Sequence, residues 1–537
     1  MPEYLSPGVY VEEVPSGPRP IEGVGTSTAG IVGPTERGPT TPRLVTNWGQ
    51  YQRWYGDVTP VAASFTSFAA RGFFENGGVR LFVARITGAG AAAAALDAVT
   101  ANAAQSLRIT ANGAGDWGNR LFVRVRGSSK TDAGGNPIGF RVTVLYFRTA
   151  PNPFVDPLDP ANFGNVDRVE PDFVEDYDDL SFDPLDGNYV LNRINSNSTL
   201  LHADWLDTTI PGDLPNNIAF TPLAGGADGA AATSVEFLGN AAVPPDQRTG
   251  LAALEGIDEI ALLFVPDQVH PGLNGVDQDA VMNAMVTQCE RLADRFAVLS
   301  VLGQQGNVGG INPPRDTSYA AIYYPWVRVF DPFTRDTVLV PPVGHVTGIY
   351  ARTDRERGVH KAPANEVVRD IVTRDINATR RPLEFTVSKG DHDILNPRGI
   401  NVIRDFRADR RGIRVWGART MSSDPLWRYI NVRRLFNYVK ESVDEGTQWV
   451  VFEPNDDNTW AKVRQSVSDF LTLVWRSGAL FGTTEEQAFF VRCGPETMTP
   501  ADIDAGRLIV EVGIAPVKPA EFVIFRFQQK TVELATN

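Results

Sequence analysis

The chain has 537 residues, of which 42% are hydrophobic, including 29 Phe and 10 Trp. This composition excludes a disordered chain and predicts roughly three or four globular domains of ~100 to 200 residues each. A net charge of −14 argues against a nucleic-acid coat, which needs clustered Lys and Arg. The two cysteines, Cys289 and Cys493, cannot form a disulfide framework and indicate a reducing compartment.

The first 22 residues contain five prolines, too many for a helix or a central strand, and predict an extended arm. Within it, residues 9–11 (Val-Tyr-Val) are prone to form a strand but have no local partner, and an unpaired strand seeks a sheet edge. The chain shows neither a basic start followed by an apolar run nor eighteen consecutive apolar residues. We therefore expect no export by a signal peptide and no membrane span.

Residues 23–88 predict a small α/β unit that ends in a strand at 79–86, and the alanine-rich residues 89–95 predict a linker. Residues 89–229 predict a β-rich segment. Its expected strands lie at 107–110, 121–126 and 140–147. The stretch 170–186 carries eight acidic residues and no basic one. We interpret it as a solvated loop rather than a calcium site, because it lacks the spaced ligands of an EF-hand.

Residues 230–394 alternate between strand and helix patterns, which predicts a layered α/β domain. The expected strands are 260–265 and 296–301, and the expected helices are 277–294 and 342–352.

The region 395–520 predicts a helix at 427–445 closed by Gly446, a strand at 448–452 and a second helix at 459–477. One face of this second helix is apolar, whereas Lys462, Arg464 and Asp469 lie on the remainder. Residues 521–537 form a C-terminal arm with a strand candidate at 521–528, a segment suited to joining another sheet.

Several motifs resemble those of contractile tail sheath proteins, which occur in myophage tails, R-type pyocins and extracellular contractile injection systems. The matching segments are Arg414-Val-Trp-Gly-Ala-Arg-Thr-Met-Ser-Ser-Asp424 with Trp427 and Val432-Arg-Arg434, Leu5-Ser-Pro-Gly-Val-Tyr-Val-Glu-Glu-Val14, Gly30-Ile-Val-Gly33, Arg37-Gly38-Pro39, Leu223-Ala-Gly-Gly-Ala-Asp-Gly229 and Arg248-Thr-Gly-Leu-Ala-Ala-Leu254. The resemblance implies a non-enzymatic subunit of a helical sleeve around a tube. The sleeve would contract to drive the tube through a target envelope.

The resemblance also implies a mixed α/β, multidomain fold. Its parts would be an N-terminal arm (1–22), an inner domain of 23–88 with 395–520, a β-rich outer insertion (89–229), a layered α/β central domain (230–394) and a C-terminal arm (521–537). The inner domain would be α+β and completed by strands exchanged between subunits.

The implied site residues belong to the arms, their joints and one helix. They are Leu5, Val9, Tyr10, Val11 and Val14 in the N-arm strand, Phe522, Val523, Ile524, Phe525 and Phe527 in the C-arm strand, Pro15, Pro18, Pro20, Pro516 and Pro519 as hinges, and Lys462, Arg464 and Asp469 facing the tube. The implied partners are further copies in stacked hexameric rings, an inner tube protein, and baseplate and terminal cap proteins. Assembly would take place in the bacterial cytoplasm, without cofactor, metal, nucleic acid or membrane insertion.

Sequence patterns of enzymatic sites are incomplete in this chain. Gly113-Ala-Gly-Asp-Trp-Gly118 fits a dinucleotide fingerprint formally, but a strand pattern follows where a helix is needed, so we expect a hairpin turn. The five histidines show no i, i+4 pair, and Asp391-His-Asp393 beside Gly390 is read as a turn rather than a cation site. A surface-layer or fibre-like assembly protein and a cytosolic α/β hydrolase or nucleotide enzyme remain as alternatives.

An arginine-rich run offers one more alternative. It comprises Arg398, Arg404, Arg407, Arg410, Arg411, Arg414 and Arg419. Such a run can bind nucleic acid, but the interleaved Asp405 and Asp409 favour salt bridges within or between subunits.

Overall fold

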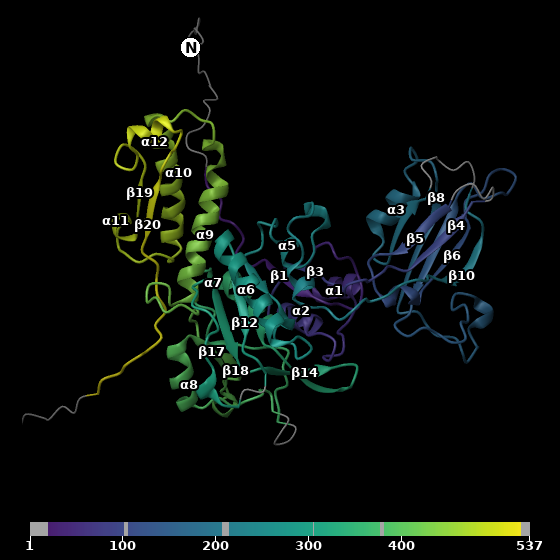
Figure 1. Cartoon of the computed structure of the whole chain (residues 1–537), viewed down its shortest axis with the longest axis horizontal. Coiled ribbons are helices and arrows are strands. Elements are labelled where there is room, and N and C mark those ends of the chain that lie inside the picture. Colours follow the sequence, from purple (N-terminus) through teal and green to yellow (C-terminus); the bar gives the residue numbers. More distant parts are fainter. Residues whose placement is uncertain (1–19, 101–105, 207–213, 304–305, 376–380, 528–537) are drawn as a thin grey trace, which may run out of the picture. The chain divides into compact units, whose positions relative to one another are not determined.

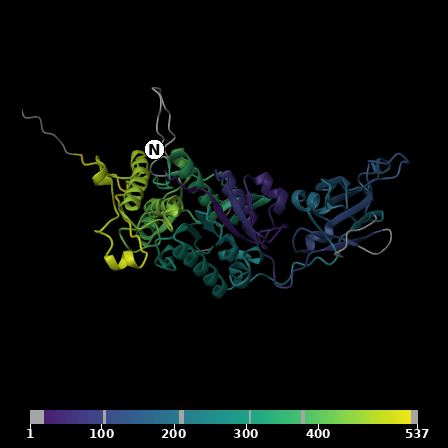
Figure 2. The same cartoon turned by 90° about the horizontal axis from the view of Figure 1, so that it is seen from above.

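The computed structural model describes residues 20–100, 106–206, 214–303, 306–375 and 381–527 (Figures 1 and 2). The chain divides into two compact units. The larger unit comprises Gly25–Arg352 and Ala364–Ser423, and the smaller one comprises, among the described residues, 20–24, Thr353–Pro363 and 424–527. The smaller unit is therefore assembled from three segments that are distant in the sequence.

A nine-stranded sheet forms the centre of the larger unit. From edge to edge its strands are β16 (Glu366–Val367), β18 (Ile413–Val415), β17 (Ile400–Asp405), β13 (Ala320–Tyr324), β12 (Phe296–Ser300), β11 (Leu262–Phe264), β1 (Ala29–Gly33), β3 (Leu81–Arg85) and β2 (Arg43–Val45). The six strands from β17 to β3 are parallel, and β2, β16 and β18 join their neighbours antiparallel. Strands β1, β11, β12 and β13 are buried along their whole length, as parallel strands covered on both faces are.

Helices connect these strands. They are α1 (Trp48–Tyr55), α2 (Thr66–Glu75), α4 (Ser234–Leu238), α5 (Gly250–Leu254), α6 (Gly275–Leu292), α7 (Val343–Arg357) and α8 (Lys389–Leu395). The alternation of strand and helix confirms the predicted layered α/β architecture. Asn274 caps α6 by accepting a hydrogen bond from Asp277 N at 3.0 Å, so the helix begins at Gly275, two residues before its predicted start.

The strand pairing in the sheet differs from the predicted division into an inner domain and a central domain. β1 pairs with β11, with Ala29 opposite Leu262, and β17 pairs with β13, with Ile400 opposite Ile322. Residues 25–88 and 395–423 therefore share one sheet with the central segment, rather than forming a domain with the helices beyond residue 424. These pairings join strands that are far apart in the sequence, which no local pattern reveals.

Residues 95–222 form two smaller sheets over a common core (Figure 1, blue). One sheet has the order β4 (Ala95–Val99), β5 (Ser106–Ala111), β9 (Leu201–Trp205), and the other has β10 (Ile218–Pro222), β6 (Leu121–Gly127), β7 (Phe140–Tyr146), β8 (Phe173–Leu180); α3 (Val190–Asn197) packs with them. The buried indole of Trp117 lies in their shared core. Residues 113–118 thus lead from one sheet to the other, and the predicted hairpin turn at this position is wrong.

The acidic stretch 170–186 is not the loop that its charge predicted. Its middle forms β8, an edge strand paired antiparallel with β7. Arg141 on β7 forms ion pairs with Asp176 and, at 3.2 Å, with Asp178, so cross-strand pairs compensate part of the charge. Charge on an exposed edge also discourages the addition of another strand.

Another local prediction is corrected. Asp391-His-Asp393 lies inside α8 rather than in a turn, because Ser388 and Asp391 form a capping box that starts the helix. A hairpin of β14 (Val327–Asp331) and β15 (Asp336–Val340) extends the chain between β13 and α7.

The smaller unit contains two long helices and one hairpin (Figure 1, yellow-green). Its elements are α9 (Ile430–Thr447), α10 (Asp457–Arg476), α11 (Glu485–Ala488), β19 (Phe489–Arg492), α12 (Pro500–Asp504) and β20 (Glu511–Ile514). The predicted apolar face of the second helix is confirmed, since Val463, Val467 and Phe470 are all buried. The predicted strand at 448–452 is wrong: a 3-10 turn follows α9 directly, and Phe452 is fully exposed.

Candidate functional site

The predicted N-terminal arm lies largely outside the described residues. Leu5, Val9, Tyr10, Val11, Val14, Pro15 and Pro18 all belong to that part of the chain. The described chain begins at Pro20 and follows α9: Ile21 is buried in the core of the smaller unit, and Val24 N donates to Ser442 Oγ at 3.1 Å. The arm is thus anchored at its C-terminal end.

Two glycines make this anchor possible. A Cβ on Gly446 would lie 2.7 Å from Ile21 Cγ1, and a Cβ on Gly23 would lie 2.2 Å from the Tyr438 hydroxyl oxygen. Gly446, which the sequence predicted to close the helix, instead lies within α9, which ends at Thr447. Its role is to let the arm approach the helix closely, and not to terminate it.

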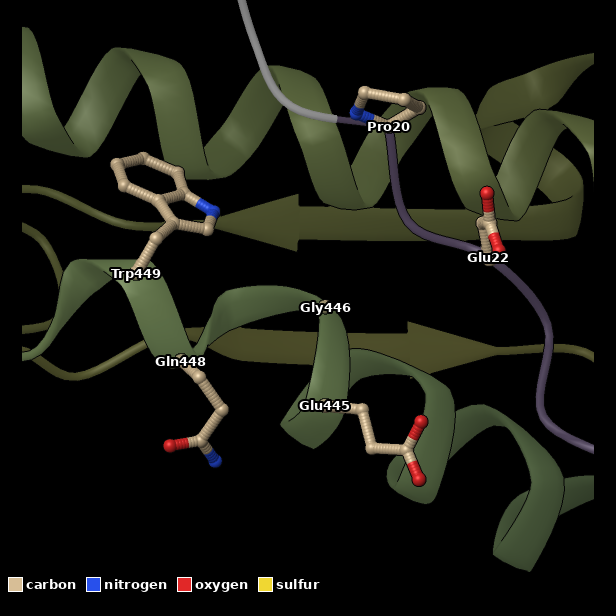
Figure 3. Close-up of a pocket in the computed structure, with 6 residues that line it drawn as sticks. All are labelled: Pro20, Glu22, Glu445, Gly446, Gln448 and Trp449. Atoms are coloured by element: carbon tan, nitrogen blue, oxygen red, sulfur yellow. The ribbon is translucent and has the colours of Figure 1, made fainter. Parts of the chain in front are cut away.

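A pocket of about 560 Å³ lies where the arm meets the end of α9 (Figure 3). It is lined by Pro20, Glu22, Glu445, Gly446, Gln448 and Trp449. Pro20 and Glu22 come from the arm, and the other four come from the end of α9 and the turn after it. The pocket is open to solvent and both carboxylates are exposed, so it has neither the enclosure nor the apolar lining of a catalytic cleft.

The hairpin β19–β20 forms a two-stranded sheet. The two strands pair antiparallel, with Phe489 opposite Ile514, and neither pairs with another named strand in the described part of the chain. A two-stranded sheet is only marginally stable unless further strands or a helix pack with it. Here α10 packs against β19, and no third strand joins the hairpin among the described residues.

The five predicted C-arm residues follow this hairpin. Phe522, Val523, Ile524, Phe525 and Phe527 are between 71% and 94% exposed and form no strand with the part of the chain that the structure describes. Pro516, a predicted hinge, is instead held by a bridge to Leu480, and Val517 N donates to Ala479 O at 3.2 Å. The chain stays attached to the smaller unit as far as Glu521, whose carboxylate accepts a hydrogen bond from the Tyr429 hydroxyl at 3.1 Å. The second predicted hinge, Pro519, therefore lies before the last attachment point and directly ahead of the exposed segment.

The three predicted tube-facing residues do not share one face of α10. Lys462 and Asp469 are exposed and lie seven residues apart, hence on one stripe of the helix. Arg464 lies about 200° around the helix from Lys462, and its guanidinium donates to the carbonyl oxygen of Cys493. The exposed stripe continues instead through Arg476 and Leu473, whose side chain is 62% exposed.

A buried ion pair inside the smaller unit was not predicted. Both terminal nitrogens of Arg434 donate to Asp354, at 2.9 and 2.5 Å, and the two side chains are only 3% and 2% exposed. The neighbouring Asn431 Nδ2 donates to His360 O at 2.8 Å and Val517 O at 3.1 Å. These contacts join α9 to residues 353–363 and to Val517, four residues before the C-terminal arm. Charged residues at 433 and 434 within an apolar helix pattern were the available signal.

A nucleotide crevice is the main enzymatic alternative for such a sheet. In parallel α/β sheets, ligands bind where the strand order reverses, which here lies beyond the carboxyl ends of β1 and β11. Asp267 fills this position: it accepts from Ser64 Oγ and Thr66 Oγ, both at 2.7 Å, and from Phe65 N at 2.6 Å. Burial raises the pKa of Asp267, although these hydrogen bonds oppose the rise. A carboxylate therefore takes the place at the start of α2 that a phosphate would need.

No group of three or more His, Cys, Asp or Glu side chains suited to a metal ion occurs among the residues that the structure describes. Among the helices it describes, none combines the length and the apolar composition of a membrane span. Burial raises the pKa of the Cys289 thiol and lowers that of His345 to about 4, and both side chains are fully buried.

Two family models match the chain. The phage tail sheath protein central domain matches residues 240–421, and the phage tail sheath C-terminal domain matches residues 422–530. These spans of 182 and 109 residues cover 291 residues, more than half of the chain. Their border lies two residues from the boundary of the compact units at Ser423.

Similar sequences carry the same description. A putative prophage major tail sheath protein of Pseudomonas aeruginosa is 26% identical over 302 residues, 52% of this chain and 69% of that protein. The tail sheath protein of Burkholderia phage BcepMu is 25% identical over 323 residues, 58% of this chain and 64% of that protein. The chain thus spans about two thirds of the length of these relatives.

Two solved structures share the fold. The sheath of the PVC extracellular contractile injection system, in the contracted state, superimposes with a TM-score of 0.56 at 21% identity and covers 99% of both chains. The contracted helical sheath of the anti-feeding prophage gives 0.57 at 24% identity and covers 98% of this chain and 100% of that one. With both sheath domains matched in order along the sequence, this chain belongs to the contractile tail sheath protein family.

Proposed function

We propose that copies of this chain polymerise into a helical sleeve around an inner tube and that contraction of the sleeve drives the tube through a target envelope. As a tail sheath protein, the chain is a structural subunit. The observation that carries the proposal is the combination, in the smaller unit, of an exposed apolar segment at 522–527 and a two-stranded sheet that no third strand joins among the described residues. A strand without a sheet and a two-stranded sheet complement each other between copies.

The exposed segment supports a partner on energetic grounds. Full burial of a Val, Ile or Phe side chain contributes about 1.5–3 kcal/mol relative to exposure. Five such side chains in one short segment form an apolar patch that water does not favour. Backbone hydrogen bonds to a neighbouring hairpin would add directionality, and the predicted N-terminal strand at 5–14 would join the same sheet.

We further propose that the exposed stripe of α10, with Lys462 and Asp469, faces the tube. Polar contacts of this kind are weak and solvent-screened, so the sleeve can slide off the tube when it contracts. The insertion 89–229 would then lie on the outside of the sleeve. A chain in the baseplate structure of the anti-feeding prophage shares this fold, and we expect this chain to meet baseplate and terminal cap proteins at the two ends of stacked hexameric rings.

We propose that the chain has no catalytic activity and that contraction uses no bound nucleotide. The extended sleeve would be a metastable packing whose energy is stored at assembly and released when the subunits repack. Assembly would take place in the bacterial cytoplasm, consistent with two buried, free cysteines.

Negative-stain electron microscopy tests this function. The purified chain, alone and with its cognate tube protein, would be compared with chains lacking residues 1–20 or 521–537. Tubes or striated sleeves that disappear on either truncation are expected. Compact, monodisperse particles under every condition, unchanged by truncation, would refute the proposal.

A further inference from the structure

An uncompensated cluster of positive charge lies on the larger unit. Residues 395–423 contain seven Arg and two Asp in a chain with a net charge of −14. Most of these arginines surround the turn between β17 and β18. We call the set of six residues at this turn the arginine surface: Arg404, Phe406, Arg410, Arg411, Arg414 and Trp416.

Two aromatic rings form the base of the arginine surface. The rings of Phe406 and Trp416 lie 4.7 Å apart between centroids. The Arg411 guanidinium carbon lies 5.0 Å from the Phe406 centroid and 5.2 Å from the Trp416 centroid, and that of Arg404 lies 5.0 Å from Phe406. Stacking on aromatic faces holds these side chains in place while their N–H edges stay available for a carboxylate.

The carboxylates of the same run do not compensate these charges. Asp405 pairs with Arg407, which also reaches Asp375 at 3.0 Å. In the described part of the chain, none of the four arginines of the surface forms an ion pair with a carboxylate. Arg414 Nη1 donates to Asn365 O at 2.6 Å and Arg411 Nη2 to Asn365 Oδ1 at 3.2 Å, which orients both without neutralising them. The expected salt bridge to Asp409 is absent among these residues.

The same chain carries a complementary feature. The turn after β8, Asp183-Pro-Leu-Asp-Gly187, which we call the acidic turn, exposes both carboxylates and a leucine that is 95% exposed. Asp183 Oδ1 accepts from Leu185 N at 2.9 Å, and Asp186 Oδ1 accepts from Asn188 N at 2.8 Å. Neither Asp has a cationic partner within the described residues. The turn is therefore preorganised, which lowers the entropic cost of docking.

We propose that the acidic turn of one copy docks on the arginine surface of a second copy. Asp183 and Asp186 would accept bidentate hydrogen bonds from the exposed guanidinium edges, and Leu185 would pack against the parts of Phe406 and Trp416 that the arginines leave exposed. The two surfaces differ, so the contact is head-to-tail and generates open chains, as a helical assembly requires. This inference rests on the self-assembly proposed above. A nucleic acid could also bind the arginines and stack on the aromatic rings. It would leave the exposed Leu185 without a contact, however, and the net negative charge of the chain would repel it.

Disulfide trapping in the full chain tests the contact. The pair Ala408→Cys and Gly187→Cys keeps every proposed contact residue, and the native Cys289 and Cys493 are buried. Under mild oxidation we expect a ladder of cross-linked species on a non-reducing gel. The matched control pairs Ala408→Cys with Gly164→Cys, a second exposed glycine of the insertion with nothing within 4 Å of its Cβ position; it should remain monomeric.

Charge reversal then tests the chemistry. In the cross-linking background, R410E/R411E should slow ladder formation by at least about tenfold, and adding D183R/D186R should restore it. The proposed contact would be overturned if the Gly187→Cys and Gly164→Cys chains formed cross-linked ladders equally well. It would also be overturned if D183R/D186R failed to restore ladder formation in the R410E/R411E background. Ladders without sleeves in micrographs would support the contact and refute the proposed function. Sleeves without ladders would do the reverse. An absence of ladders with binding of a short single-stranded oligonucleotide that R410E/R411E abolishes would assign the surface to nucleic acid instead.

Discussion

Replacing Arg434 with methionine is expected to destabilise the smaller unit severely. The substitution leaves the Asp354 carboxylate, which is 2% exposed, buried without its bidentate partner. Breaking one half of a buried ion pair typically costs about 3–5 kcal/mol, because the remaining charge is desolvated and uncompensated. At about 1.4 kcal/mol per factor of ten, the lower figure corresponds to roughly 150-fold more frequent opening of α9.

Hydrogen exchange measured peptide by peptide reports this opening within the full chain. We expect protection of residues 430–447 to fall by about that factor in Arg434→Met. The matched control is Arg507→Met in the same unit: its partner Asp502 lies 3.2 Å away, but the arginine side chain is 68% exposed, so about 0–1 kcal/mol is expected.

A second variant separates burial from pairing. Asp354→Leu combined with Arg434→Met removes both charges, and replacing a complete buried pair by apolar side chains is often close to neutral. The double variant should therefore be more protected than Arg434→Met alone. If Arg434→Met and Arg507→Met lose protection equally, or if the double variant is the least stable, the reasoning from burial is refuted.

Three further outcomes follow from the structure. Burial lowers the pKa of His345 to about 4 from an ordinary 6.5, so between these two pH values the unfolded chain binds a proton that the folded chain does not. Stability should therefore fall by about 3 kcal/mol as the pH drops from 6.5 to 4. Urea unfolding measured at a series of pH values should show this dependence, and His345→Gln should flatten it, whereas His202→Gln, at a half-exposed site, should not. Gly446→Ala should detach residues 20–24 from α9, because the new methyl group overlaps Ile21, and should weaken this attachment by about 1–3 kcal/mol. Proteolysis at residues 20–24 should therefore become faster. Gly25→Ala should leave the proteolysis rate unchanged, because nothing lies within 4 Å of the added Cβ. Lys462→Glu should weaken co-sedimentation with the tube protein while leaving the melting temperature unchanged, and equal binding to wild type would exclude that stripe of α10 from the tube contact.

Local periodicity predicted the individual elements well where one face of a segment is buried. The spacing of Val463, Val467, Phe470 and Val474 placed α10 within two residues at its start and one at its end. The apolar runs of β11 and β12 were likewise recognised, because strands inside a parallel sheet are apolar throughout. These signals lie within each segment and need no knowledge of its neighbours.

Predictions drawn from acidic composition or from a glycine were wrong where a partner distant in the sequence decides the local structure. Residues 173–180 form a strand because Arg141 and the backbone of β7 pair with them, although their composition is that of a solvated loop. The helical position 446 is occupied by a glycine because Ile21, more than 400 residues away in the sequence, packs where a Cβ would lie. Neither partner lies within the window that a local pattern covers.

The amino-acid sequence by itself determined the alternation of strands and helices, the apolar segment at the C-terminus and the motifs of the sheath family, because each depends on residues close together in the chain. Only the tertiary structure decided that residues 25–88 share a sheet with the central segment, that Asp354 and Arg434 form a buried pair, and that the arginine surface has no carboxylate partner of its own among the described residues. Those features depend on backbone pairing and on burial between segments that are hundreds of residues apart or, for the arginines, on which side chains the fold brings within reach.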